Sequence, residues 1–173
     1  MISIEQYEYL LKLPKKVELK GNLEEEVSFN TEIPMKNSFK LISPEDSEFS
    51  FIYVINQSEK NHYKLSLFLM HDDEKIGLIR IDFNGQHLNP ESITENLPDK
   101  FHRYAGKFFK YDEPHIHYHI DGYKNLAWAI PLENDPFKIK EINNQEDTVN
   151  AFCEFNSLIN LQTKFLLGTK FLV

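Results

Sequence analysis

The alternation of apolar and polar positions changes along the chain from a helical period to a strand period and back. Residues 3–13 place apolar side chains at helical spacing, and Ser3 precedes Gln6 as in a capping box. Between residues 15 and 83 apolar positions recur with the period of a strand, interrupted by short polar turns. Residues 144–160 return to helical spacing. This order predicts two helices that flank a strand-rich middle.

Several runs of alternating or continuously apolar residues are predicted to be strands. Those between residues 49 and 83 are joined by loops of about five residues, which is typical of an antiparallel meander. Segment 101–109 is compatible with a further strand, and the apolar tail 165–173 with an edge strand or a contact surface. We therefore expect an α+β fold, in which an N-terminal and a C-terminal helix pack on a mainly antiparallel, twisted sheet. The predicted strands are Val17–Lys20, Val27–Ile33, Ser38–Ile42, Phe49–Ile55, Tyr63–Met70, Ile76–Phe83, a strand that begins at His115, and Leu126–Ile130.

The composition is that of a soluble globular protein. With 173 residues, of which 41% are apolar, the chain is long enough for one domain, residues 1–173, with its own core. The single cysteine, Cys153, excludes an internal disulfide and is predicted to lie on the buried face of the C-terminal helix. No apolar run approaches the roughly 20 residues of a membrane span, and the first residues do not resemble a signal peptide. We expect a cytoplasmic protein without membrane contact, and its oligomeric state stays open.

The net charge narrows the classes of partner. At −8, the chain is unlike a general nucleic-acid binder, because contacts with phosphates need lysine and arginine. The charge is uneven, however: residues 100–124 carry five basic and three acidic side chains, a local excess of +2 before any histidine is protonated. A locally basic site and chance clustering are both compatible with this distribution.

The residues that most suggest chemistry lie within this basic window. His115, His117 and His119 occupy alternate positions of one predicted strand. Because strand side chains alternate between faces, the pattern places three imidazoles on one face and an apolar stripe on the other. Two other histidines, His62 and His71, flank an earlier strand and are expected to be exposed to solvent.

Strand geometry limits how these histidines can share one metal ion. Residues two apart on a strand lie roughly 7 Å apart at Cα, and residues four apart roughly 13 Å. An ion can therefore bind His115 with His117, or His117 with His119, but hardly all three. Either pair needs a further ligand from elsewhere in the chain. The residues available for this role are His87, His102, Asp82 and Asp112.

Two other interpretations need no metal. An imidazole can donate or accept a proton near neutral pH, and Arg80 can stabilise the negative charge that develops on a phosphodiester. RNA supplies its own 2′-hydroxyl nucleophile, so His87 and the strand histidines would complete such a site. Alternatively, the three histidines are polar side chains on the exposed face of a sheet and share no role.

The histidine strand resembles a known signature. His115-Ile116-His117-Tyr118-His119-Ile120-Asp121 resembles the His-φ-His-φ-His-φ-φ pattern, with φ apolar, of the histidine-triad nucleotide hydrolases and transferases, and departs from it at the last position. The resemblance implies that His117 attacks the α-phosphate of a nucleotide. The Gly- and Gln-rich segment that this family has upstream is replaced here by residues 108–113, and the C-terminal helix is foreign to it.

A second resemblance covers roughly residues 78–160 and rests on several short motifs. The motifs are Arg80-x-Asp82, His87-x-Asn89-Pro90 and Pro114-His115-x-His117. They resemble a small uncharacterised bacterial family and are similar in pattern to TumE-like toxins of bacterial toxin–antitoxin modules. The long segment between residues 87 and 114, the additional His119 and the acidic net charge depart from that pattern. The resemblance implies that five residues share one site: Arg80, Asp82, His87, His115 and His117.

These observations lead to one leading hypothesis and two alternatives. The leading hypothesis is a toxin-like or defence-related protein that acts on RNA or a nucleotide by histidine acid–base chemistry, without a cofactor. One alternative is a non-enzymatic, antitoxin-like or anti-defence protein whose acidic segments 24–26 and 72–74 block a basic protein partner. The other is a metal-dependent hydrolase that uses the His-x-His pair. The assigned residues are His87, His115 and His117 as catalytic groups, Arg80 as phosphate ligand, and Asp82, Asn89 and His119 as supporting groups.

Overall fold

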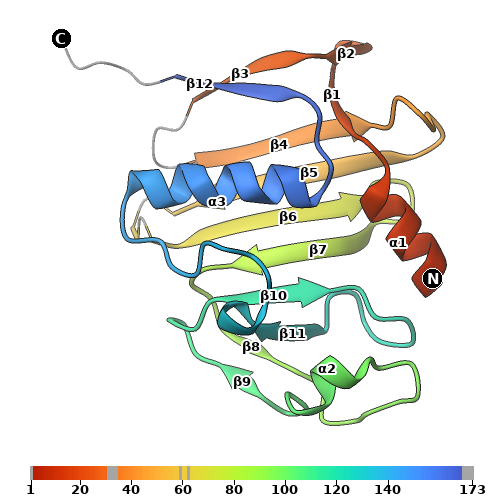
Figure 1. The fold of residues 1–173 in the computed structure, drawn as a ribbon, viewed down its shortest axis with the longest axis vertical. Coiled ribbons are helices and arrows are strands. Elements are labelled where there is room, and N and C mark those ends of the chain that lie inside the picture. Colours follow the sequence, from red (N-terminus) through yellow and green to blue (C-terminus); the bar gives the residue numbers. More distant parts are fainter. Residues whose placement is uncertain (1, 31–34, 59, 62, 169–173) are drawn as a thin grey trace.

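The computed structural model describes residues 2–30, 35–58, 60–61 and 63–168. His62 and the ends of two predicted segments, residues 31–33 and 169–173, lie outside these described residues. The fold is α+β with a large antiparallel sheet, which confirms the predicted class (Figure 1). Among the described residues, no helix is long and apolar enough to cross a membrane.

An eight-stranded sheet forms the centre of the fold. Every neighbouring pair in it is antiparallel. The strands β5 (Ser50–Gln57), β6 (Leu65–His71) and β7 (Ile76–Asp82) follow one another as the predicted meander. Alternate side chains of β5 and β6 are buried, as the period of two predicts. In spatial order the strands are β11 (Trp128–Pro131), β10 (His115–Tyr118), β7 (Ile76–Asp82), β6 (Leu65–His71), β5 (Ser50–Gln57), β4 (Met35–Ile42), β1 (Lys16–Leu19) and β2 (Asn22–Glu24).

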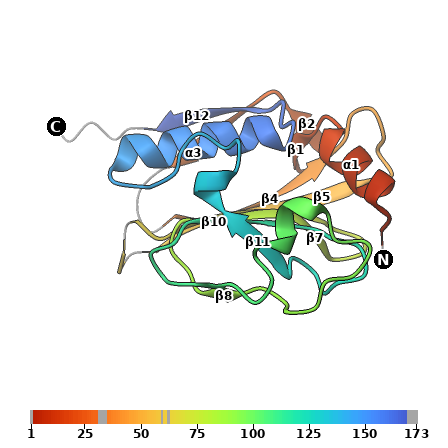
Figure 2. The ribbon, with the colours of Figure 1, turned by 60° about the horizontal axis from the view of Figure 1, so that its bottom comes forward.

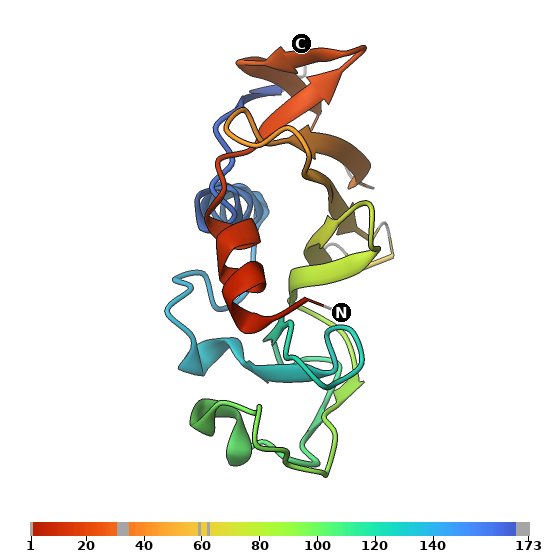
Figure 3. The same cartoon turned by 90° about the vertical axis from the view of Figure 1, so that its right-hand side faces the viewer.

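The two predicted helices lie on the same face of this sheet (Figures 1 and 3). They are α1 (Ile4–Lys12) and α3 (Gln145–Leu158). The side chains of Ser3 and Asn144 each accept a hydrogen bond from a backbone N–H in the first turn, so each helix begins at its capping residue. The ring of Tyr53 in β5 stacks on aromatic rings of α3 and fixes the helix against the sheet.

The N-terminal and C-terminal elements are tied together beside the sheet. The buried Nζ of Lys15 donates hydrogen bonds to three carbonyl groups at the ends of α1 and α3. Further along the chain, β12 (Lys164–Gly168) pairs in parallel with β3 (Glu26–Asn30) as a separate two-stranded sheet. The described part of the apolar tail therefore forms a strand.

The segment between β7 and β10 wraps around the sheet edge that β11 forms. On the helical face, α2 (Asp99–His102) brings Phe101 against Trp128. On the opposite face, β8 (His87–Leu88) and β9 (Phe108–Phe109) make a small two-stranded sheet over β10 (Figure 2). Of the segment 101–109, only its Phe108–Phe109 end is a strand, since its first residues belong to α2. A short 3₁₀ helix, η1 (Leu132–Asn134), follows β11.

Two predictions about burial are wrong. His71 is 3% exposed, because its ring packs against Phe49 and Phe51. Cys153 is exposed rather than buried. The buried face of α3 runs through Phe152, and the next residue points about 100° away from it around the helix.

Candidate functional site

The candidate site lies on the face of the sheet opposite the helices, where β7 and β10 pair. The register sets Arg80 directly across from His117 and Asp82 directly across from His115. Because side chains two apart on a strand share a face, all four point to the same side of the sheet. The Arg-x-Asp and His-x-His motifs, which are far apart in the sequence, are therefore direct neighbours.

Asp82 is the charged centre of this group. Its Oδ1 accepts hydrogen bonds from Nε of Arg80 at 3.0 Å and from Nη2 at 2.9 Å. Its Oδ2 lies 2.8 Å from Nε of Arg80, 3.3 Å from Nε2 of His117 and 3.9 Å from Nε2 of His115. Burial acts to raise the pKa of Asp82, but hydrogen bonds to the carboxylate and the charge of Arg80 outweigh it and hold that pKa well below its usual value. The carboxylate is therefore ionised at neutral pH.

Backbone carbonyls decide which nitrogen of each strand imidazole is free. Nδ1 of His115 lies 2.7 Å from the carbonyl oxygen of Glu113, and Nδ1 of His117 lies 3.0 Å from that of Leu126. A carbonyl only accepts, so each Nδ1 carries a proton and each Nε2 of a neutral ring keeps its lone pair. Among the described residues neither Nε2 has a hydrogen-bond partner, although both are buried. Burial also lowers the pKa of His115 to about 4, so this ring is neutral at pH 7.

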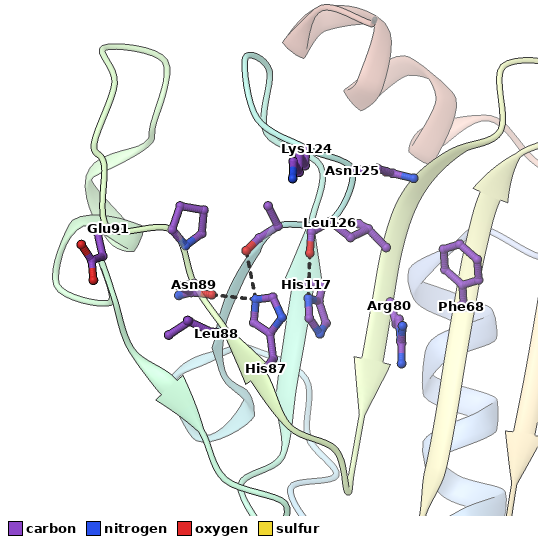
Figure 4. Close-up of a pocket in the computed structure, with 12 residues that line it drawn as sticks. Phe68, Arg80, His87, Leu88, Asn89, Glu91, His117, Lys124, Asn125 and Leu126 are labelled. Atoms are coloured by element: carbon purple, nitrogen blue, oxygen red, sulfur yellow. Dashed lines mark hydrogen bonds between the residues drawn. The ribbon is translucent and has the colours of Figure 1, made fainter.

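His87 approaches the pair from β8. Its ring centroid lies 4.5 Å from that of His117 and 5.9 Å from that of His115. Its Nε2 donates to Oδ1 of Asn89 at 3.0 Å and to the carbonyl of Ala127 at 2.9 Å. Its Nδ1 is therefore the unprotonated nitrogen, and it lies on the side of the ring toward His117 (Figure 4). Burial lowers the pKa of His87.

Asn89 joins His87 to the edge of the sheet. Its Oδ1 accepts from the backbone N–H of Ala129 at 2.9 Å, and its Nδ2 donates to the Ala129 carbonyl at 2.8 Å and to that of Tyr104 at 3.0 Å. One side chain thus occupies the place of the next strand beside β11. Because the same Oδ1 binds the His87 ring, closing the sheet edge also orients that histidine.

The turn before β11 supplies two of the carbonyls. Leu126 has a φ of 51°, in the left-handed region that leucine rarely adopts. Its side chain lies over Gly77, where a Cβ would come within 2.7 Å of its Cδ1. The Leu126 carbonyl accepts from His117, and the next carbonyl, that of Ala127, accepts from His87. Packing on Gly77 therefore helps to hold both imidazoles.

These groups open onto a pocket of about 690 Å³, a volume in the range of small-molecule sites (Figure 4). Its lining includes the basic Lys124 and the apolar Leu88 together with His87 and His117. The side chain of Arg80, which also lines the pocket, is 46% exposed. His115 is only 1% exposed and lies behind the lining. A ligand in the pocket can therefore reach Arg80, His87 and His117, whereas Asp82 and His115 lie behind the lining.

His119 does not lie with the other two histidines, so the predicted row of three imidazoles is wrong. Its Nε2 is 3.4 Å from the carbonyl of Ile2, and its ring centroid is 5.6 Å from that of Tyr7 in α1. The regular pairing of β10 ends at Tyr118, so the alternation of faces does not continue beyond it. Of the further metal ligands considered, His102 binds the Leu97 carbonyl at 2.9 Å and does not approach the pair.

Several groups in the acidic segments have basic neighbours. Glu25 forms an ion pair with Lys16, and Asp72 forms one with Lys75. Glu26 lies 3.3 Å from the ammonium group of Lys164. The negative charge at these turns is therefore partly balanced within the chain.

Sequence reasoning missed the groups that fix the imidazoles. These are the carbonyls of Glu113, Leu126 and Ala127, and the small residue Gly77 that makes room for Leu126. Every residue has a backbone carbonyl, so the sequence does not show which carbonyls accept these hydrogen bonds. A glycine inside a predicted strand was the one available signal, because it often marks a close approach of other atoms.

Fold and site together define an α+β protein with a buried Asp–His–His cluster beside an open pocket that contains basic side chains. The chain belongs to a family of unknown function (DUF6978), whose profile matches residues 2–160. The match includes every residue of the site. No curated protein and no solved structure matches the chain. What the site does must therefore be argued from its own geometry.

Proposed function

We propose that the protein is a metal-dependent hydrolase of phosphate esters in RNA or a nucleotide, with the ion bound by Asp82, His115 and His117. One observation carries the proposal: Oδ2 of the aspartate and the two Nε2 atoms are buried, and the ligand atoms of the three residues lie within 4.8 Å of one another. Acceptor atoms that face one another away from water repel and lose their hydration. A single proton can join the carboxylate to only one imidazole, whereas a divalent cation contacts all three atoms.

The distances suit a small transition-metal ion such as Zn²⁺. Tetrahedral bonds of about 2.0–2.1 Å put ligand atoms roughly 3.4 Å apart. The observed separations from Oδ2 are 3.3 Å for His117 and 3.9 Å for His115, both close to that value. Donation of the other ring N–H to a carbonyl is the usual outer contact of a metal-bound histidine. Three protein ligands leave a fourth position for water, as in catalytic zinc sites.

The same geometry disfavours His115 and His117 as acid–base groups. Each Nδ1 already donates to a carbonyl, and each Nε2 faces Asp82. Neither ring therefore has a nitrogen left for a substrate. His87 differs, because its Nδ1 is unprotonated and its ring lines the pocket. We assign the acid–base role to His87.

The proposed reaction uses these groups in sequence. An ion held by Asp82, His115 and His117 would lower the pKa of a bound water toward about 7 and so supply the nucleophile. His87 Nδ1 accepts the proton of the water as the new O–P bond forms. The bond from phosphorus to the leaving oxygen breaks, and that oxygen takes the proton from His87. Arg80 directs two N–H groups at Asp82 and has others with which to stabilise the non-bridging oxygens.

Metal content and chelation test the proposal together. We expect about one equivalent of bound ion per chain, loss of bis(p-nitrophenyl) phosphate hydrolysis after dialysis against EDTA, and recovery when metal is added. His115→Ala should weaken metal binding at least about tenfold and abolish hydrolysis. His102→Gln, a histidine change away from the cluster, is the matched control and should retain both. Hydrolysis by fully metal-free protein, or a failure to bind any metal, would contradict the proposal.

A second candidate function, metal-free acid–base cleavage of RNA, is favoured by the open Nδ1 of His87 in the pocket. Expression in a bacterial host tests both candidates against the toxin-like hypothesis. Growth inhibition that His87→Ala and His115→Ala both abolish supports the metal-dependent reaction. Growth inhibition that only His87→Ala abolishes supports the metal-free reaction. Inhibition that neither change affects would favour a non-enzymatic interaction protein instead.

A further inference from the structure

An exposed apolar pair stands beside the pocket on the outer side of the β8–β9 sheet. Leu88 and Phe108 are direct partners in the register of this sheet, and they are 61% and 50% exposed. Their neighbours His87 and Phe109 pair on the inner side, over the candidate site. Leu88 also lines the pocket. The outer strip, as we call Leu88 and Phe108, therefore extends the apolar wall of the pocket to the surface.

The surroundings of the outer strip are basic, although the protein as a whole is acidic. Residues 100–111 contain four basic side chains and no acidic one, in a chain of net charge −8. Lys110 lies two residues beyond Phe108 and is exposed. Arg80 and Lys124 line the pocket that Leu88 borders. Glu91 also lines this pocket, and Lys107 forms an ion pair with Glu113, so the positive charge beside the outer strip comes from Arg80, Lys110 and Lys124.

We propose that the outer strip and the pocket together bind a single strand of nucleic acid. The inference rests on the proposed function: the reacting phosphate lies at Arg80 and the metal, while a neighbouring base stacks on Phe108. Aromatic rings that lie among basic side chains bind single strands with little sequence specificity, because every base can stack on such a ring. The strand must be single, because bases in a duplex already stack on one another.

The position of Phe108 favours a single strand over two other ligands, a free nucleotide and a protein partner. Phe108 is not part of the pocket lining, so a free nucleotide in the pocket leaves it uncovered. A strand that continues from the pocket covers both parts at once. For a protein partner the apolar area of two side chains is small, whereas the flanking basic charge suits a phosphate backbone.

Binding of a labelled strand tests the inference directly. Fluorescence anisotropy with a ten-nucleotide oligouridine, in EDTA to prevent cleavage, should show binding by the wild type that Phe108→Ala weakens about tenfold. Phe108→Trp keeps an aromatic face and should retain the affinity. Tyr63→Ala removes another exposed aromatic ring, 53% exposed, and serves as the matched control. Oligothymidine in place of oligouridine shows whether the surface accepts DNA as well as RNA.

The outcomes separate this inference from the proposed function. It is overturned when Phe108→Ala binds the strand as tightly as the wild type, or when uridine monophosphate competes as well as the unlabelled strand. In steady-state assays Phe108→Ala should raise KM for the strand about tenfold more than KM for bis(p-nitrophenyl) phosphate. Metal-independent hydrolysis of the small diester refutes the proposed function alone, because strand binding in EDTA does not depend on it.

Discussion

Replacement of Gly77 by alanine is expected to weaken metal binding without changing a ligand. The new Cβ would lie 2.7 Å from Cδ1 of Leu126 and 2.9 Å from its Cγ. Because Cγ is also too close, rotation of the terminal methyl groups does not relieve the contact. Relief requires a rotation of the whole Leu126 side chain or a shift of its backbone, which already has a φ of 51°. A shift of the backbone also moves the Leu126 carbonyl, the acceptor for Nδ1 of His117.

The size of the effect can be estimated from two separate terms. Overpacking of a buried contact costs about 1–3 kcal/mol of folding free energy, which lowers the melting temperature of a chain of this length by roughly 2–12 °C. Loss of the outer hydrogen bond of a metal-bound histidine weakens metal binding about 10–100-fold, or about 1.4–2.8 kcal/mol. The second term is specific to the site, so the assay must measure metal affinity separately from stability.

Isothermal titration calorimetry with Zn²⁺ and a thermal melt provide the two measurements. Gly85→Ala is the matched control, because a Cβ there has its nearest neighbour at 3.7 Å, in ordinary contact. The double change Gly77→Ala/Leu126→Ala removes the clash and should restore much of the zinc affinity. A Gly77→Ala protein that melts earlier but binds Zn²⁺ as tightly as the wild type would refute the argument that Leu126 positions His117.

Three further changes test other parts of the structure. Asn89→Ala removes four hydrogen bonds at the buried sheet edge and should lower the unfolding free energy by about 3–5 kcal/mol in urea denaturation; a loss below about 1 kcal/mol would contradict the edge-closing role. Lys15→Met removes the donor to the carbonyls of Leu11, Leu13 and Ile159 and should lower the unfolding free energy by about 2–4 kcal/mol. Lys12→Met, a change at an exposed lysine, is the control and should leave the unfolding free energy unchanged. Burial lowers the pKa of His115 from 6.5 to about 4, so its contribution to the stability of metal-free protein is complete above pH 6.5 and is lost as the pH falls toward 4. Over that range the unfolding free energy of the wild type should fall by about 3 kcal/mol more than that of His115→Leu, as measured by urea denaturation in EDTA. Parallel pH profiles of the two proteins would contradict this contribution of His115.

The parts of the fold that local pattern decides could be predicted from the sequence. Alternation from residue 49 to 83 yields β5, β6 and β7 within a few residues of their predicted ends, because each strand buries one apolar face. The path of residues 84–112 could not be predicted. It depends on one side chain, Asn89, that closes the edge of β11, and such a contact between distant segments has no periodicity. The exposure of Cys153 was missed because a one-residue step around a helix changes the face.

The assembly of the site depends on strand register, which a sequence specifies only indirectly. Pairing of β7 with β10 brings the Arg80-x-Asp82 and His115-x-His117 motifs together, and a slip of one residue would have turned one motif to the helical face. His119 does not lie beside His115 and His117 because the regular pairing of β10 ends at Tyr118. The alternating sequence does not indicate this end.

The chemical role of each histidine depends on its neighbours more than on its own position. A strand imidazole with a free nitrogen toward the pocket could act as an acid or base, which is the role that the sequence suggests for His115 and His117. Carbonyls of Glu113 and Leu126 occupy the Nδ1 atoms and turn the Nε2 lone pairs toward Asp82, which suits ligands rather than proton carriers. At His87 the carbonyl of Ala127 takes the opposite nitrogen, Nε2, and leaves Nδ1 open. Consecutive carbonyls of one turn, those of Leu126 and Ala127, bind opposite nitrogens of His117 and His87. The conformation of this turn therefore distinguishes the proposed metal ligand His117 from the proposed base His87.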